Sequence, residues 1–164
     1  MTALVHSPVS VIHLAATFFA LLTGTTSLLA AKGTRRHRYL GRAYVGSMVL
    51  VLATAFGIYT LFGRFGIVHW GAVGSAGALL VGTGSVAWRS AVRAWQQWHY
   101  WGMGASVTSL YAALAGESAY RLLPMTYFWW STLGPASVVL LVGTRLLYRH
   151  HPATRASRAS VARL

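Results

Sequence analysis

Apolar positions along this chain fall into five long runs that are separated by short polar stretches. Each run has about 20 residues or more, and a helix of that length rises far enough to cross about 30 Å of hydrocarbon. The pattern therefore predicts five membrane-spanning helices, over residues 8–31, 39–63, 67–88, 99–119 and 125–147. The expected fold class is an all-α integral membrane protein, a bundle of five transmembrane helices.

Composition agrees with this pattern. Of the 164 residues, 55% are hydrophobic and only 9% are charged, whereas water-soluble chains carry about 25% charged residues. We expect a single helical bundle over residues 1–147 and a basic cytoplasmic tail over residues 148–164. The bilayer is the first partner that this composition predicts.

The basic residues predict an orientation. Cytoplasmic loops of membrane proteins carry an excess of Lys and Arg, and residues 32–42, between the first two runs, hold five of the fourteen. With the N-terminus outside and the C-terminus inside, only Arg64 and Arg121 fall outside. The topology is therefore predicted as N-out and C-in, in a bacterial inner (plasma) membrane. Twelve basic residues then face the cytoplasm: Lys32, Arg35, Arg36, Arg38, Arg42, Arg89, Arg93, Arg145, Arg149, Arg155, Arg158 and Arg163.

Charge and residue content exclude several classes of function. The formal net charge is +13, but the basic residues lie between apolar runs, where they act as topology signals and contact lipid phosphates. We therefore expect no nucleic-acid partner. The chain has no cysteine, which excludes disulfides and thiolate metal sites. No nucleophile motif or phosphate-binding loop is present, which argues against a hydrolase or a kinase but leaves open whether the protein is an enzyme.

Four histidines at the ends of the predicted spans are the candidates for chemistry. His13 and His69 enter the first and third spans from the outside, and His37 and His99 lie at the inner ends of the second and fourth. Ionisable groups are costly within the hydrocarbon and usually functional there. The spacing thus predicts an outer and an inner histidine pair, each from alternate helices.

Two imidazoles on facing helices can ligate a b-type haem from both sides. Small residues such as Ala16, Gly74 and Gly102 would leave room for the porphyrin. The layout is similar to that of transmembrane di-haem b-type cytochromes, which pass electrons from ascorbate across membranes. A protein of this kind would move electrons within or across the bilayer, to or from a quinone. The repeat of Gly74, Ala78 and Gly82 predicts close helix packing or a flat ligand.

Each polar residue also has a simpler interpretation. His37 lies among arginines and can contact lipid phosphate, and His99 lies in an aromatic stretch typical of a membrane interface. Glu117 precedes Arg121 by four residues, a favourable order for an ion pair on a helix. The histidines outside the spans are expected to be solvated: His6, His150 and His151.

Two other classes of function remain open. His13, His69 and Glu117 would form a two-histidine, one-carboxylate set that suits zinc or iron, so the protein could be a metal or proton carrier. It could also be a non-catalytic accessory subunit of a larger membrane complex. The outer histidines would then be packing or interface groups.

Several motifs together resemble a known family. These are His13, the string from His37 to Tyr44 (His-Arg-Tyr-Leu-Gly-Arg-Ala-Tyr), His69, His99-x-x-Gly-Met and Arg121-x-x-Pro. They are similar to the uncharacterised bacterial integral membrane proteins of domain-of-unknown-function family 2306, over roughly residues 10–147. The resemblance implies a multi-span membrane protein with these histidines as its signature, and it implies no particular activity.

Overall fold

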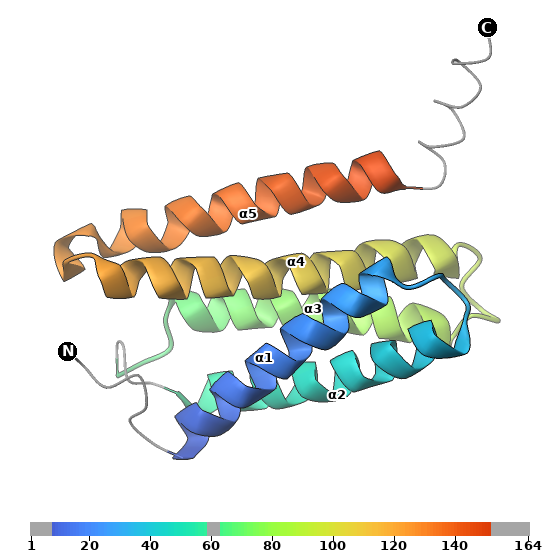
Figure 1. Ribbon diagram of the computed structural model, residues 1–164, viewed down its shortest axis with the longest axis horizontal. Coiled ribbons are helices and arrows are strands. Elements are labelled where there is room, and N and C mark those ends of the chain that lie inside the picture. Colours follow the sequence, from blue (N-terminus) through green and yellow to red (C-terminus); the bar gives the residue numbers. More distant parts are fainter. Residues whose placement is uncertain (1–7, 59–62, 152–164) are drawn as a thin grey trace, which may run out of the picture. The chain divides into compact units, whose positions relative to one another are not determined.

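The structure, a computed structural model, describes residues 8–58 and 63–151. These residues form five α-helices and one short 3-10 helix (Figure 1). The predicted all-α fold class is confirmed for this part of the chain. In order, the elements are α1 (Pro8–Leu29), α2 (Arg35–Gly57), α3 (Ile67–Ala87), α4 (Trp95–Leu122), η1 (Met125–Tyr127) and α5 (Phe128–His150).

Four helical stretches are long and apolar enough to cross a membrane, as in a multi-pass membrane protein. They are α1, α2, α3 and the stretch from η1 through α5. The remaining helix, α4, has 28 residues and a length of about 42 Å, but it contains no stretch as apolar as those of the other four. Four of the five predicted spans thus have support, while the span over residues 99–119, which lies in α4, and the N-out orientation stay predictions.

The helix bounds differ from the predicted ones mainly at α2, α4 and α5. α4 begins at Trp95, four residues before the predicted span, and ends at Leu122, three residues after it. α2 begins at Arg35, four residues before the predicted span, and ends at Gly57, six residues early. Apolarity locates the part of a helix inside the bilayer, whereas capping locates its first turn, and Thr34 accepts a hydrogen bond from the His37 backbone at 3.2 Å. α5 runs three residues past the predicted end, into the expected tail, and the tail from residue 152 on lies outside the described residues.

The chain divides into two compact units, one up to Val81 and the other from Gly82 on. The division falls inside α3, so this helix contributes residues to both units. The single bundle expected over residues 1–147 stays a prediction.

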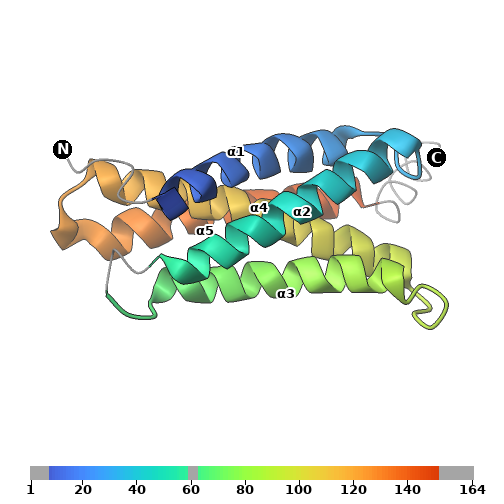
Figure 2. The same ribbon diagram turned by 90° about the horizontal axis from the view of Figure 1, so that it is seen from below.

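The first unit is built on a hairpin of α1 and α2, which lie side by side in both views (Figure 1, Figure 2). On each helix the buried positions recur every three or four residues, as one helix face requires. Small residues dominate the buried face of α1, and large ones occur on α2, where Tyr44 and Met48 are each only 1% exposed. The buried positions are Ala16, Ala20, Leu21, Thr23, Gly24 and Ser27 on α1, and Tyr44, Ser47, Met48 and Val51 on α2.

The turn between α1 and α2 is fixed by local contacts. Gly33 has a φ of 79°, a backbone conformation that glycine adopts without steric cost. The Lys32 ammonium donates hydrogen bonds to the carbonyls of Ser27 and Leu28, at 3.2 and 2.7 Å, and so satisfies acceptors that the end of a helix leaves open. Burial lowers the pKa of Lys32 below its ordinary value of 10.5.

In the second unit, α4 and α5 pack closely through small residues. A Cβ on Gly116 would lie 2.8 Å from the Thr132 carbonyl oxygen, and one on Gly143 would clash with the Thr108 side chain. Gly104, Thr108, Ala112 and Gly116 recur every four positions on α4, the spacing that lets two helices approach. Because α5 covers this face, these small residues of α4 are packed against a neighbouring helix.

The repeat of small residues predicted on α3 is only partly a packing surface. Gly82 contacts α4, since a Cβ there would lie 2.8 Å from the Met103 backbone nitrogen. A Cβ on Gly74 would meet no atom within 4 Å, so Gly74 leaves open space and packs against no helix there. The repeat of small residues on α3 is therefore a close packing surface at Gly82 but not at Gly74. The helix that makes close contacts along its length is α4, whose own repeat includes threonine and alanine as well as glycine.

Candidate functional site

His13 is held by the other helix of its hairpin. Its Nδ1 lies 2.8 Å from Thr54 Oγ1 on α2. The hydroxyl of Thr54 donates its single proton to its own helix, where the Leu50 and Val51 carbonyls lie at 2.7 and 3.0 Å. Thr54 therefore accepts the proton of His13 Nδ1, and in the neutral ring the lone pair lies on Nε2.

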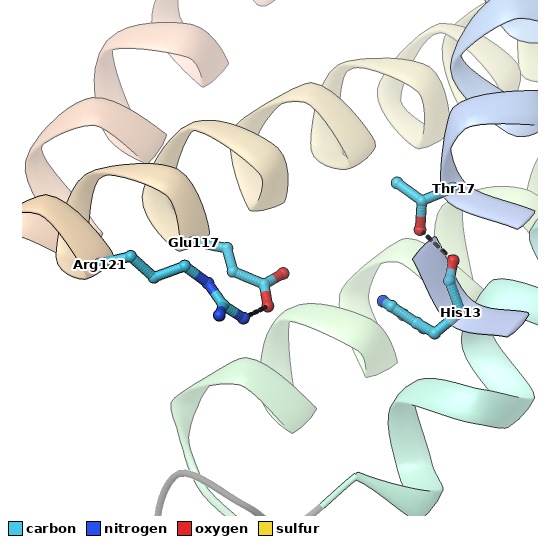
Figure 3. A network of polar contacts seen from close by, with 4 residues as sticks. All are labelled: His13, Thr17, Glu117 and Arg121. Atoms are coloured by element: carbon cyan, nitrogen blue, oxygen red, sulfur yellow. Dashed lines mark hydrogen bonds and ion pairs between the residues drawn. The ribbon is translucent and has the colours of Figure 1, made fainter. Parts of the chain in front are cut away.

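The hydrogen bond with Thr54 also offsets the free-energy cost of placing the polar His13 ring in an apolar helix. The ring is half-buried, and a buried polar nitrogen without a partner would cost about 1–3 kcal/mol. Thr17 adds a second polar contact, since its hydroxyl donates to the His13 backbone carbonyl at 2.8 Å (Figure 3). A ligand is thus not required to explain why His13 lies there, although the ring orientation suits one.

His37 shows the same arrangement at the other end of the hairpin. Its Nδ1 lies 3.1 Å from the carbonyl oxygen of Ser27 on α1, and the Ser27 hydroxyl lies at 3.4 Å. A carbonyl only accepts hydrogen bonds, so Nδ1 carries the proton and Nε2 the lone pair. His37 therefore points toward α1 and is not directed outward with the arginines beside it.

His99, in the second unit, repeats this contact. Its Nδ1 lies 2.8 Å from the carbonyl oxygen of Gly82 on α3, and the ring is half-buried. Again the proton is on Nδ1 and the lone pair on Nε2. The aromatic residues around His99 predicted anchoring at the membrane surface, but the ring itself is oriented by a neighbouring helix.

His69 has the opposite arrangement. The Gly66 backbone N–H donates to its Nδ1 at 3.1 Å, so Nδ1 accepts and the neutral ring carries its proton on Nε2. The ring is only 4% exposed and stacks on Phe65, with 4.8 Å between ring centroids. A metal or iron bond at Nε2 would require the proton to move and the Gly66 contact to break.

Glu117 pairs with Arg121, as its spacing predicted. Arg121 Nη2 lies 2.8 Å from Glu117 Oε1, and both side chains are partly exposed on α4 (Figure 3). No group of three or more histidine, aspartate or glutamate side chains that could hold a metal ion occurs in residues 8–58 and 63–151. The zinc or iron set of His13, His69 and Glu117 thus gains no support from the described residues.

The predicted histidine pairs stay predictions. His13 and His69 belong to the same unit. His37 belongs to the first unit and His99 to the second. Of the small residues expected to make room for a porphyrin, Ala16 and Gly102 are buried, while the space beside Gly74 is open.

His151 was expected to be solvated, and it is instead only partly exposed. Its ring packs against two aromatic side chains of α4, with centroids 5.2 Å from Tyr100 and 5.6 Å from Trp101. Tyr148 also contacts Trp101, at 4.7 Å. The spacing of Tyr148 and His151, one helical turn apart, was a signal that both face the same neighbour. His150 is exposed as expected, and His6 lies outside the described residues.

No protein-family model, no curated protein and no solved structure matches this chain. The resemblance to domain-of-unknown-function family 2306 stays a prediction.

Proposed function

We propose that this chain is a membrane-embedded b-type haem protein that moves electrons within or across the bilayer, with His13, His37 and His99 as axial ligands. The observation that carries the proposal is the contact that these three histidines share. The Nδ1 of each lies within hydrogen-bond distance of an oxygen on a neighbouring helix, and a ring that donates its Nδ1 proton there has its lone pair on Nε2. Histidines that ligate metals almost always donate their other ring N–H in this way.

The hydrogen bond at Nδ1 has two effects on a ligating histidine. It fixes the direction in which Nε2 points, and it raises the basicity of the ring, which strengthens a bond to iron. Bound haem supplies a one-electron couple whose potential depends on its axial ligands and their hydrogen bonds. His69, whose hydrogen bond assigns the proton to Nε2, is not among the proposed ligands.

The electron partner that we propose is a quinone in the same bilayer. A lipid-soluble carrier can reach side chains in the spans without leaving the membrane. The proposed location is a bacterial inner membrane, which the family resemblance supports.

A visible absorption spectrum of the purified protein in detergent, oxidised and reduced, tests the proposal. We expect a reduced α-band of b-type haem, either as purified or after titration with haemin. His13→Ala, His37→Ala and His99→Ala should each lose haem, and two variants that lose the same band identify two ligands of one haem. His69→Ala and His150→Ala are the controls and should keep the full spectrum.

A second pair of variants tests the hydrogen bond itself. Thr54→Val removes the acceptor of the His13 proton, whereas Thr54→Ser keeps it. Loss of such a supporting contact costs about 10–100-fold in metal affinity, so we expect weaker haem retention in Thr54→Val alone. A protein that binds no haemin, or a His69→Ala variant that loses as much haem as His13→Ala, would contradict the proposal.

A further inference from the structure

The outer face of α2 carries a basic stripe, defined here as Arg35, Arg38 and Arg42. At about 100° per residue, these positions lie within about 60° of one another around the helix. All three residues are exposed. They lie roughly opposite the buried face of the helix, which consists of Tyr44, Ser47, Met48 and Val51.

No carboxylate side chain of this protein balances the basic stripe. The sequence contains a single acidic residue, Glu117, and Arg121 already pairs with it. The neighbouring Lys32 has a different role, since its ammonium caps the carbonyls of α1. Within the stripe, Arg38 donates one hydrogen bond to the Gly33 carbonyl at 3.3 Å. The charge of the stripe thus requires anions from elsewhere.

The same face becomes apolar one turn further along the helix. Gly46, Val49 and Ala53, called here the apolar strip, continue the line of the three arginines and are exposed. A Cβ on Gly46 would meet no atom within 4 Å, so there is open space beside the strip at that point. Tyr39, which is 75% exposed, lies beside the arginines, as tyrosines do at membrane interfaces.

We propose that this face of α2 binds an anionic phospholipid, with its phosphate on the basic stripe and an acyl chain along the apolar strip. The basic stripe and the apolar strip follow one another along the same helix face, and this order favours a lipid over other anions. A nucleic acid or an acidic protein would match the arginines but not the exposed strip that continues from them. A phospholipid carries an anionic head and a hydrocarbon chain in the same order.

Native mass spectrometry of the detergent-solubilised protein, titrated with phosphatidylglycerol, tests the proposal. The stripe variant replaces Arg35, Arg38 and Arg42 with Gln, which keeps a good helix former at each position. A matched control replaces three other exposed basic residues, Arg36, Arg89 and Arg93, and so removes the same charge. Each arginine near a lipid phosphate contributes about fivefold in affinity, so we expect the stripe variant to weaken binding about tenfold or more, and the control about threefold or less.

Further arms of the experiment separate the sources of the anion. Phosphatidylcholine should bind weakly to the wild type and both variants, and inorganic phosphate or the acyl-free headgroup, glycerophosphoglycerol, should not displace the bound lipid. Equal losses in the stripe variant and the control would show that only net charge matters and would overturn the site. Displacement by the acyl-free headgroup would overturn the role of the apolar strip. Circular dichroism of both variants checks that the helices are retained.

Discussion

The two helix hairpins of this protein reach close packing by different means. In the α1–α2 hairpin, the buried face combines small residues on α1 with two large side chains of α2, Tyr44 and Met48. In the α4–α5 hairpin, glycines bring the helices together, and Gly116 and Gly143 leave no room for a Cβ. The first hairpin should therefore be sensitive to lost volume and the second to added volume.

The hairpins differ also in how well their helices suit a bilayer. Both helices of the first are apolar enough to span it, whereas in the second only the stretch that includes α5 is. The number of spans therefore depends on α4, which is long enough to cross the membrane. The predictions below test this comparison, from the largest expected effect to the smallest.

Reporter fusions at residues 92 and 155 decide whether α4 crosses the membrane. These positions lie before α4 and after α5. If both helices cross, the two reporters are on the same side, and the twelve-to-two bias of basic residues predicts the cytoplasm. A fusion at residue 36 should report the cytoplasm as well. Reporters at 92 and 155 on opposite sides would show that α4 does not cross and would remove the five-span topology.

Truncation of the Tyr44 side chain should strongly lower the stability of the first hairpin. Its side chain is 1% exposed, and truncation of a buried aromatic residue to alanine costs about 3–5 kcal/mol. We expect Tyr44→Ala to lower the free energy of unfolding by about that amount, measured by denaturant unfolding in detergent. Tyr39→Ala is the control: that side chain is exposed, so the change should be within about 0.5 kcal/mol. Equal effects of the two variants would contradict the described packing.

A methyl group on Gly116 should destabilise the second hairpin. A Cβ there would lie 2.8 Å from a backbone oxygen, which cannot move aside as a side chain can. We expect Gly116→Ala to cost about 1–3 kcal/mol, the range for overpacking. Gly41→Ala is the matched change in the first hairpin, where the nearest atom would be Ser27 Oγ at 3.8 Å.

The same unfolding measurement compares the two glycine variants. Gly41→Ala should be neutral or stabilising by up to about 1 kcal/mol, because alanine is the better helix former. If Gly41→Ala proves as costly as Gly116→Ala, the two hairpins do not differ in the way described.

The smallest expected effect is a dependence of stability on alkaline pH through Lys32. Its pKa in the folded protein is lowered below 10.5 by burial, so between the two values the unfolded chain binds more protons than the folded one. The free energy of unfolding should therefore rise with pH across that window. Lys32→Gln should remove this dependence of the free energy of unfolding on pH. Arg36→Gln, a change at an exposed position in the first turn of α2, should leave the dependence unchanged. A slope that persists in Lys32→Gln would assign it to another group.

The sequence alone determined the features that depend on local order. The start of α3 at Ile67 was predicted correctly, because apolar runs and their polar ends are local signals. The ion pair of Glu117 and Arg121 was predictable for the same reason, since residues four apart share a helix face. His37 was likewise expected at one end of the second helix, and it lies in the first turn of α2, whereas the cytoplasmic side of that end stays a prediction.

Only the tertiary structure decided which atoms those elements bring together. The tautomers of His13 and His99 depend on Thr54 and Gly82, which are 41 and 17 residues away, and no local pattern specifies such partners. The contacts of His151 with Tyr100 and Trp101 also join residues that lie far apart in the chain. A small-residue repeat, such as that of α3, shows that a helix can be approached closely. Which neighbouring helix makes that approach depends on how whole helices pair. A helix face is buried only by a neighbouring helix whose surface has a matching shape.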